Sequence, residues 1–386
     1  MLISEILDTF GKLVYNRIRE KAIEGEIVNK PRALSEELKP EDVTATARET
    51  CKNWFHKIAS IRELLPRLYV EMAIIHCYKF LYRDPFLPIF TRINRQLRGI
   101  GDPLVATFAR AYLARKGFEA KPSLKQYLVV GFCDHLEVQQ QLLNSKKLTS
   151  ILSSNAIDHA TYLDLYSPAI DWLLQCIAHG CKDQGPLLEI LAKYKQNKDA
   201  LTLHLIISNF HPEMIAQLAV EITALVQTSN DAGFSKNKLY SALGVHLVLT
   251  PPRKEHQLPL LNEVWKYISA LQDVQEYINL AEIWIEFPVK YCTLSDVNTM
   301  LRDIYEHVNK DSLHEKFQTQ LQSISEKVLS NYPDFTVVYK IVNFPQSKFL
   351  ETEIFNNPLF FLLAYFPQNF GPFQWRERST SEQSSA

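Results

Sequence analysis

The chain of 386 residues has 46% hydrophobic residues, 22% charged residues and a formal net charge of -1. This composition excludes an intrinsically disordered chain, and the balanced charge gives no support for nucleic-acid binding, which relies on a basic surface. With only 11 glycines, the chain is also poor in the residue that β-hairpins and phosphate-binding loops use at positive φ.

Apolar residues recur at helical spacing along most of the chain. Polar or proline-bearing links separate the helical stretches, as at 24–42 and 145–160, and no alternating β pattern of any length is present. In chain order, the predicted helices are 3–20, 42–58, 67–82, 85–97, 103–117, 123–143, 163–177, 186–194, 201–210, 214–227, 238–249, 258–271, 274–287, 293–308 and 313–329.

Several helix starts carry local signals. Pro66 falls one turn after Ser60, where it either kinks the helix or restarts it at the first helical position. Gly117 is a suitable residue to end the helix that starts at Pro103. Capping boxes are predicted for three pairs, Ser60 with Glu63, Ser123 with Gln126, and Thr293 with Asp296.

The helix count and spacing indicate the architecture. A helix pair roughly every 35–45 residues is typical of HEAT-like repeats, although no strict sequence repeat is visible. We therefore predict an all-α fold, a HEAT-like α-solenoid of antiparallel helix pairs, over residues 1–343. A compact helical bundle is the alternative. Residues 344–375 form a tail rich in proline and aromatic residues, and the polar residues 376–386 are predicted to be disordered.

Cysteine use and hydropathy indicate the compartment. The six cysteines are dispersed, the first residues lack a basic segment followed by a long apolar run, and no stretch reaches the roughly 18 apolar residues of a membrane span. These features predict a reduced cytoplasmic protein with buried free thiols.

No catalytic motif is recognisable, so we expect neither an enzyme nor a bound cofactor or metal. Cys176, His179 and Cys181 mix metal-ligating residue types, but no second pair completes a zinc site. Cys133, Asp134 and His135 are consecutive, and helix neighbours point about 100° apart, so they cannot converge. A small basic group, which we expect to be solvated, consists of Arg110, Arg115 and Lys116.

Two proline-bearing corners are the candidate working surface. The first is Pro66-Arg67-Leu68-Tyr69, and the second contains Arg98, Gly101, Asp102 and Pro103. Arginine and tyrosine are favoured interface anchors, and proline-fixed turns preorganise a surface. From the residues alone, two interpretations stay open: a partner-docking face, or two ordinary helix starts whose polar side chains are locally paired.

Several runs of the sequence resemble one family, the vacuolar protein sorting-associated protein 35-like proteins. These proteins are the large α-solenoid subunit of the endosomal retriever complex and are related to the retromer scaffold. The resemblance covers roughly residues 3–340 in order and is carried by 6–15, 47–55, 57–67, 98–104, 109–113, 165–172, 261–265 and 277–284.

The resemblance implies a non-enzymatic scaffold, peripheral on endosomes, that returns membrane proteins from endosomes to the cell surface. It implies an arrestin-like partner subunit, engaged by the element Pro66-Arg67-Leu68-Tyr69, and cooperation with the COMMD–coiled-coil (CCC) complex and a sorting nexin. Membrane association would then be indirect. The resemblance assigns the docking role to Arg67, Tyr69 and Asp102.

The sequence also departs from the family. The family's proteins run longer at both ends, so an N-terminal arm and a C-terminal half are expected to be absent here. This puts binding of the family's phosphoesterase-fold subunit in doubt, because that subunit docks on the C-terminal half. The alternative function is a generic helical-repeat adaptor of another trafficking or assembly pathway.

Overall fold

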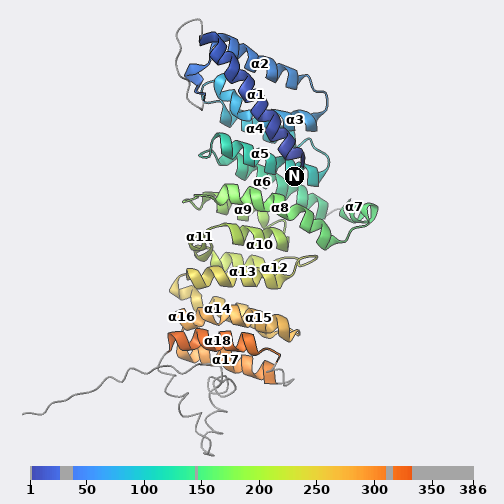
Figure 1. Cartoon of the computed structure of the whole chain (residues 1–386). Coiled ribbons are helices and arrows are strands. Elements are labelled where there is room, and N and C mark those ends of the chain that lie inside the picture. Colours follow the sequence, from blue (N-terminus) through green and yellow to red (C-terminus); the bar gives the residue numbers. More distant parts are fainter. Residues whose placement is uncertain (1, 27–37, 144–146, 310–315, 333–386) are drawn as a thin grey trace, which may run out of the picture. The chain divides into compact units, whose positions relative to one another are not determined.

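The computed structural model describes residues 2–26, 38–143, 147–309 and 316–332 (Figure 1). These residues contain helices and no strand. They fall into two compact units: unit 1 takes in Met1–Met214 and Ala224–Leu239, and unit 2 takes in Ile215–Thr223 and Tyr240–Ala386. The sequence analysis did not predict this division, and the tail predicted at 344–375 and the end at 376–386 lie outside the described residues.

Unit 1 holds the first part of the chain, shown from blue to green in Figure 1. Its elements are α1 (Leu2–Glu26), η1 (Pro40–Asp42), α2 (Ala45–Ala59), α3 (Leu64–Ala73), η2 (Ile75–Phe80), α4 (Phe86–Leu97), α5 (Pro103–Ala120), α6 (Gln126–Leu143), α7 (Lys147–Asn155), α8 (His159–Ala178), α9 (Gly185–Tyr194) and α10 (Ala200–Asn209). The boundary between the units passes through α11 (Pro212–Gln217), α12 (Ala219–Thr228) and α13 (Lys236–Leu249). Unit 2 continues with α14 (Lys254–Ser269), α15 (Val274–Trp284), α16 (Glu286–Tyr291), α17 (Leu294–Asn309) and α18 (Gln318–Asn331).

Within unit 1, successive helices alternate between two layers. Helices α3, α5, α8 and α10 contact one another in sequence in one layer, and α4, α6 and α9 do so in the other. The layers are joined by contacts such as those of α4 with α5 and of α5 with α6. Each helix therefore buries its apolar stripe against neighbours in the chain, which is how a helical-repeat array builds a core. The predicted fold class, an all-α solenoid, is confirmed.

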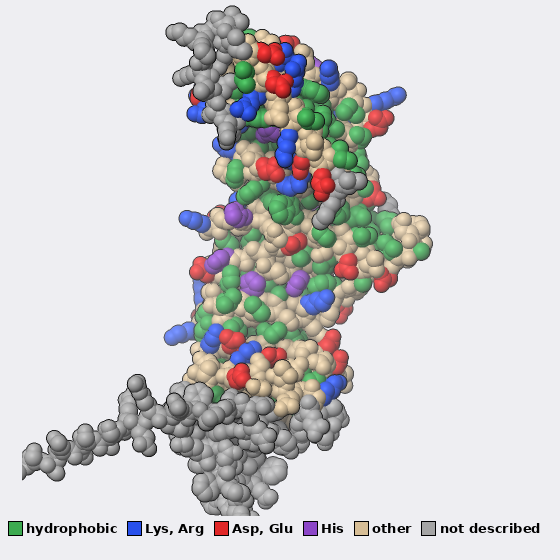
Figure 2. Space-filling view, viewed as in Figure 1, with side chains coloured by type: hydrophobic (Ala, Val, Ile, Leu, Met, Phe, Trp, Pro, Cys, Tyr) green, Lys and Arg blue, Asp and Glu red, His purple; other side chains and the backbone are tan. Residues whose placement is uncertain are grey.

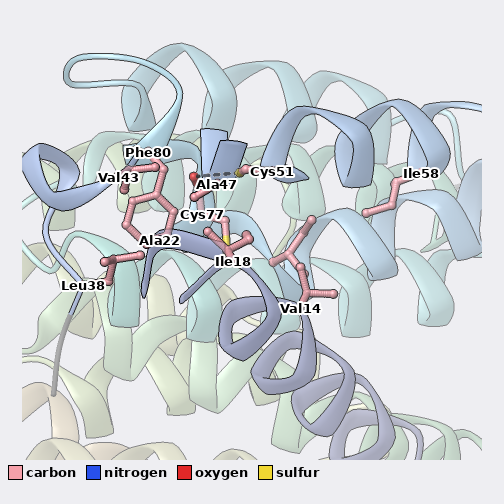
Figure 3. Packing of buried hydrophobic residues seen from close by; sticks show 11 residues of the cluster. Val14, Ile18, Ala22, Leu38, Val43, Ala47, Cys51, Ile58, Cys77 and Phe80 are labelled. Carbon is pink, nitrogen blue, oxygen red and sulfur yellow. Dashed lines mark hydrogen bonds between the residues drawn. The ribbon is translucent and has the colours of Figure 1, made fainter. Parts of the chain in front are cut away.

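The first core cluster of unit 1 shows how these stripes meet (Figure 3). Helix α1 contributes Val14, Ile18 and Ala22, each four residues after the last, and the cluster also includes Cys51 of α2 and Cys77 of η2. The Cys51 thiol donates to the Cys77 carbonyl at 3.6 Å, and burial raises the pKa of Cys51 to about 12. Both thiols therefore stay protonated and pack as small apolar groups, in agreement with the prediction that buried thiols are free.

Unit 2 is centred on Trp284 of α15, which is completely buried. Its indole N–H donates to the carbonyl of Tyr240 at 3.0 Å. Gly244 lies beneath the indole, where a methyl group would come within 2.9 Å of the indole nitrogen. Asp303 of α17 accepts hydrogen bonds from α14 and α15, so these three helices share one partly buried polar junction.

Several predicted helix boundaries are wrong. The stretch 214–227 is divided into α11 and α12, 274–287 into α15 and α16, and 67–82 tightens into the 3-10 helix η2 after Ala73. Because the apolar pattern runs on through each change, periodicity could not reveal it. Helix α7 lies in the stretch 145–160, which was predicted to be a polar link. Gly117 does not end its helix: α5 continues to Ala120, and Gly117 packs against the Tyr127 ring of α6.

The capping predictions are borne out at one of three places. Thr293 and Asp296 form the reciprocal hydrogen bonds of a capping box at the start of α17. Ser60 instead ends α2 and donates its hydroxyl proton to the Lys57 carbonyl at 2.7 Å. Ser123 lies in a turn three residues before α6 begins, too early for the cap position.

Candidate functional site

The element Pro66-Arg67-Leu68-Tyr69 forms the first turns of α3. Glu63 is the cap residue of this helix, without a side-chain cap bond, and Pro66 occupies its first turn. The first turn leaves backbone N–H groups without helical partners, so proline is tolerated there and the helix restarts without a kink. Pro66 therefore neither kinks a helix begun at Ser60 nor takes the first helical position, since α3 starts at Leu64 and Pro66 is its third residue.

The four residues of this element do not share one surface. Leu68 is 0% exposed and belongs to the core, so it can only support a docking face from beneath. Arg67 and Tyr69 are two positions apart, about 200° around the helix, and so point to opposite sides. Tyr69 packs on Tyr112 of α5, with ring centroids 5.4 Å apart, and burial raises its pKa.

Arg67 lies on the wall of a groove of about 690 Å³ that we call the Arg67 groove. The groove is bounded by α2, α3, η2, α4 and the link before α4. Its lining residues are Lys52, Phe55, His56, Ile58, Ala59, Arg67, Glu71, Tyr78, Leu81, Tyr82, Arg83, Asp84, Pro85, Pro88, Ile89, Arg92 and Gln96.

The floor of the Arg67 groove is a rigid aromatic and ionic cluster. Phe55 of α2 stacks on Tyr78 of η2 with centroids 3.9 Å apart. Tyr78 donates to Glu71 at 2.6 Å, and Arg92 of α4 forms an ion pair with the same carboxylate. Burial raises the pKa of Tyr78, and the neighbouring Glu71 raises it further. The hydroxyl therefore remains a donor that holds Glu71 in place.

This cluster determines the electrostatics of the groove. Glu71 lies one turn after Arg67 on α3, but its carboxylate is occupied by Arg92 and Tyr78. Within the described part of the chain, Arg67 forms no ion pair. Lys52 and Arg83 add positive charge to the walls, and Asp84 adds one negative charge. An arginine beside a preorganised aromatic floor is suited to binding an acidic or aromatic side chain of a partner.

The second predicted corner is satisfied internally. Arg98 binds Asp134 of α6 through two hydrogen bonds, one of them 2.7 Å long from Nε. Asp102 caps α5 by accepting from the Val105 N–H at 2.9 Å, and Pro103 occupies the first turn of the same helix. Gly101 is exposed, and a methyl group there would meet nothing within 4 Å. At this corner Asp102 shows the local pairing expected of an ordinary helix start, whereas Arg98 pairs with a residue 36 positions later in the chain.

The two corners are nevertheless close neighbours. A Cβ atom placed on Gly99 would lie 3.3 Å from a methyl carbon of Leu64, the first residue of α3. The start of α3 and the α4–α5 link therefore form one continuous edge of unit 1. Whether either corner binds a partner stays a prediction.

Sequence reasoning missed the floor of the groove. No motif in the sequence points to Phe55, Glu71, Tyr78 or Arg92. The available signal was Glu71 itself, a charged residue inside the apolar run 68–75. A carboxylate in such a position needs a partner, which here is supplied by an arginine 21 residues later.

The other sequence candidates do not assemble into sites. No group of three or more potential metal ligands occurs among the described residues. Asp134 faces Arg98 while His135 is buried against Thr107, so consecutive residues diverge as predicted. Arg110 is buried and Arg115 pairs with Asp8, so the predicted basic group is not one solvated surface.

The face of the protein shown in Figure 2 has no large patch of one charge sign. Over α1 to α4, acidic and basic side chains are interspersed in Figure 2. In the described part of the chain, no helix is both long enough and apolar enough to cross a membrane.

Comparison with known proteins gives consistent matches along the chain. The VPS35L family model matches residues 1–165, and the model of the VPS35L C-terminal domain matches residues 182–351. The chain is 40% identical to the VPS35 endosomal protein-sorting factor-like proteins of Rattus norvegicus and Homo sapiens over 345 residues, 89% of this chain. Its identity to the relative in Drosophila melanogaster is 36% over 96% of this chain. The matched regions cover 36%, 35% and 38% of these relatives, so the chain spans about a third of their length.

Proposed function

The chain belongs to the VPS35L family, and from that premise we propose that it is a non-enzymatic scaffold of a retriever-type complex in endosome-to-plasma-membrane recycling. Its relatives are named endosomal protein-sorting factors. The stacked helices of unit 1 support this proposal, because such arrays offer extended surfaces for partners. As the chain spans about a third of its relatives, the activity and partners of the longer proteins enter here only as proposals.

The proposed partner of the Arg67 groove is an arrestin-like subunit. The observation that carries this assignment is the geometry of Arg67, which forms no ion pair among the described residues and lines a groove together with the stacked rings of Phe55 and Tyr78. A guanidinium that does not have to give up an internal ion pair is a favourable anchor. The CCC complex and a sorting nexin are proposed as further partners, which would bring the scaffold to endosomes indirectly.

Co-expression of the chain with the arrestin-like subunit, followed by size-exclusion chromatography, tests the proposal. We expect the two proteins to elute together. Arg67→Glu reverses the charge at the rim and is expected to weaken the affinity by about 30-fold or more, which corresponds to about 2 kcal/mol at a hot spot. Arg62→Glu is the matched control, since Arg62 is exposed and lies outside the groove.

Circular dichroism separates binding from folding in this experiment. Arg67→Glu should leave the helical signal unchanged, because Arg67 supports no internal ion pair in the described structure. If the variant loses helicity, Arg67 is a structural residue and the docking role is wrong. Recovery of other partners without an arrestin-like subunit would favour the alternative, a helical-repeat adaptor of another pathway.

A further inference from the structure

The core of unit 1 contains an arginine without a partner. Arg110 of α5 is 2% exposed, and none of its three guanidinium nitrogens has a hydrogen-bond partner among the described residues. Burying a charged group without an acceptor is among the least favourable arrangements in a protein. Burial lowers the pKa of Arg110, whereas nearby Asp134 raises it.

Asp134 of α6 lies beside His135, which bonds Thr107 at 3.0 Å one turn before Arg110 on α5, and its charge acts on Arg110. This carboxylate is occupied by a different arginine. Both oxygens of Asp134 bind Arg98, which lies on the exposed corner after α4. The Asp134 side chain is 7% exposed, whereas that of Arg98 is 57% exposed. A buried carboxylate is thus paired with a solvated guanidinium, while a buried guanidinium beside it is left unpaired.

We propose that Asp134 is an exchangeable counter-ion, which pairs with Arg98 in the free chain and turns to Arg110 when Arg98 binds a carboxylate of a protein partner. The inference rests on the proposed scaffold function, because it requires a partner. Breaking an ion pair normally opposes docking at an arginine that is already paired. Here that loss is offset, because the released Asp134 supplies the acceptor that Arg110 lacks.

The chemistry of the corner favours a carboxylate over a phosphate as the incoming group. Arg98 already presents its planar edge to a carboxylate, so bidentate binding fits its orientation. Glu137 lies near enough to raise the pKa of Arg98, after the larger effect of its bond to Asp134. Asp102 is also exposed on the same link. Glu137 is paired with Lys193, so Asp102 is the carboxylate that repels a dianionic phosphate more strongly than a single carboxylate.

The exchange would carry a docking event into the core. His135 is buried beside Arg110, with its Nδ1 on the Thr107 hydroxyl and its Nε2 unpartnered among the described residues. Its ring lies 6.1 Å from that of Tyr166 on α8. In the exchange, the Asp134 carboxylate of α6 turns from Arg98 of the α4 corner to Arg110 of α5. Because His135 is the next residue and contacts α8, the exchange also reaches α8, which packs on α5 and α6.

A double-mutant cycle on the full chain tests the exchange directly. Arg110→Met removes the unpaired charge and is expected to raise the thermal midpoint by about 2 °C. In an Arg98→Gln background Asp134 is free to bind Arg110, so Arg110→Met is expected to lower the midpoint by a similar amount. Arg95→Gln is the matched background, because Arg95 is exposed on the same helix α4 and is not bonded to Asp134.

The sign of the effect decides the outcome. A stabilising Arg110→Met in the wild-type and Arg95→Gln backgrounds, with a destabilising one in Arg98→Gln, supports the exchange. The same sign in all three backgrounds overturns it. In particular, a loss of stability throughout would show that Arg110 already has an acceptor, such as a buried water, in the free chain.

A peptide titration tests the docking part of the inference. A hexaglutamate peptide added to the full chain with isotope-labelled arginines should shift the Nε–H signals of both Arg98 and Arg110. Arg98→Gln should abolish both shifts, and a hexa-phosphoserine peptide should bind more weakly. Shifts at Arg98 without a change at Arg110, or no binding of hexaglutamate, would overturn the proposal. Neither experiment uses the arrestin-like subunit, so failure of that partnership can be told apart from failure of the exchange.

Discussion

Replacing Asp303 with alanine should destabilise unit 2 far more than its partial exposure suggests. One oxygen of this carboxylate, Oδ2, accepts from the indole of Trp265 at 3.0 Å, from the hydroxyl of Ser269 at 2.8 Å and from the hydroxyl of Tyr277 at 2.9 Å. The three donors come from α14 and α15, whereas the acceptor is on α17. Asp303→Ala thus leaves three donors without their acceptor in one step.

The magnitude follows from the burial of each donor. Tyr277 is completely buried, so its hydroxyl cannot return to water, and an unsatisfied buried donor costs about 1–3 kcal/mol. Trp265 and Ser269 are half-buried and can be partly rehydrated, so each loses about 1 kcal/mol. We expect Asp303→Ala to lower the free energy of unfolding by about 4 kcal/mol. Asp303→Asn keeps an acceptor oxygen but loses the charge, and should lose about 1.5 kcal/mol.

Urea unfolding of the full chain, followed by circular dichroism, measures these differences. Hydrogen exchange read by mass spectrometry then shows whether the loss of protection is confined to α14, α15 and α17. Arg302→Ala is the control, because Arg302 is an exposed neighbour on α17 and should change stability by less than about 0.5 kcal/mol. The reasoning is refuted if Asp303→Ala stays within about 0.5 kcal/mol of wild type, or if Asp303→Asn is equally damaging.

Two further perturbations test other parts of the structure. Burial, followed by the charge of Arg110, lowers the pKa of His135 to about 3. When the pH is below the ordinary histidine pKa, His135 is therefore protonated in the unfolded chain but stays neutral in the folded chain. The stability that this group contributes is therefore complete above about pH 6.5 and falls as the pH drops toward 3. Between pH 7 and pH 5 we expect the free energy of unfolding to fall by about 2 kcal/mol. Urea unfolding at the two pH values measures this difference, and His135→Asn should remove it. Gly11→Ala places a methyl group 2.4 Å from the Ala73 carbonyl oxygen, a backbone atom that no rotamer change can move, and should destabilise unit 1 by about 1–3 kcal/mol in thermal melts. Gly101→Ala, which meets no atom within 4 Å, should leave the melt unchanged, and a similar loss in both variants would contradict the close approach of α1 to α3.

Local patterns in the sequence were sufficient for the fold class. Apolar spacing indicated most of the helices, and the capping box at Thr293 was correct, since both depend on residues three or four positions apart. The same spacing could not show where one helix divides into two, as at Leu218, because the apolar stripe continues through the break. The runs that resemble the VPS35L family were likewise recognisable from the residues alone and are matched by the family comparison.

The candidate site depended on contacts that no local pattern contains. Arg67 could be singled out from the sequence, and its docking role stays a prediction; only the stacking of α2, α3 and α4 shows that it borders a groove and that Tyr69 points away from it. Glu71 finds Arg92 after 21 residues and Arg98 finds Asp134 after 36. Periodicity specifies which face of each helix is buried, whereas the partner of a charged side chain is set by which helices become neighbours. The sequence therefore determined the helices and their apolar faces, and the tertiary structure decided which charges are paired. Among the described residues, it leaves Arg67 without an ion pair on the wall of its groove and Arg110 without a hydrogen-bond partner in the core.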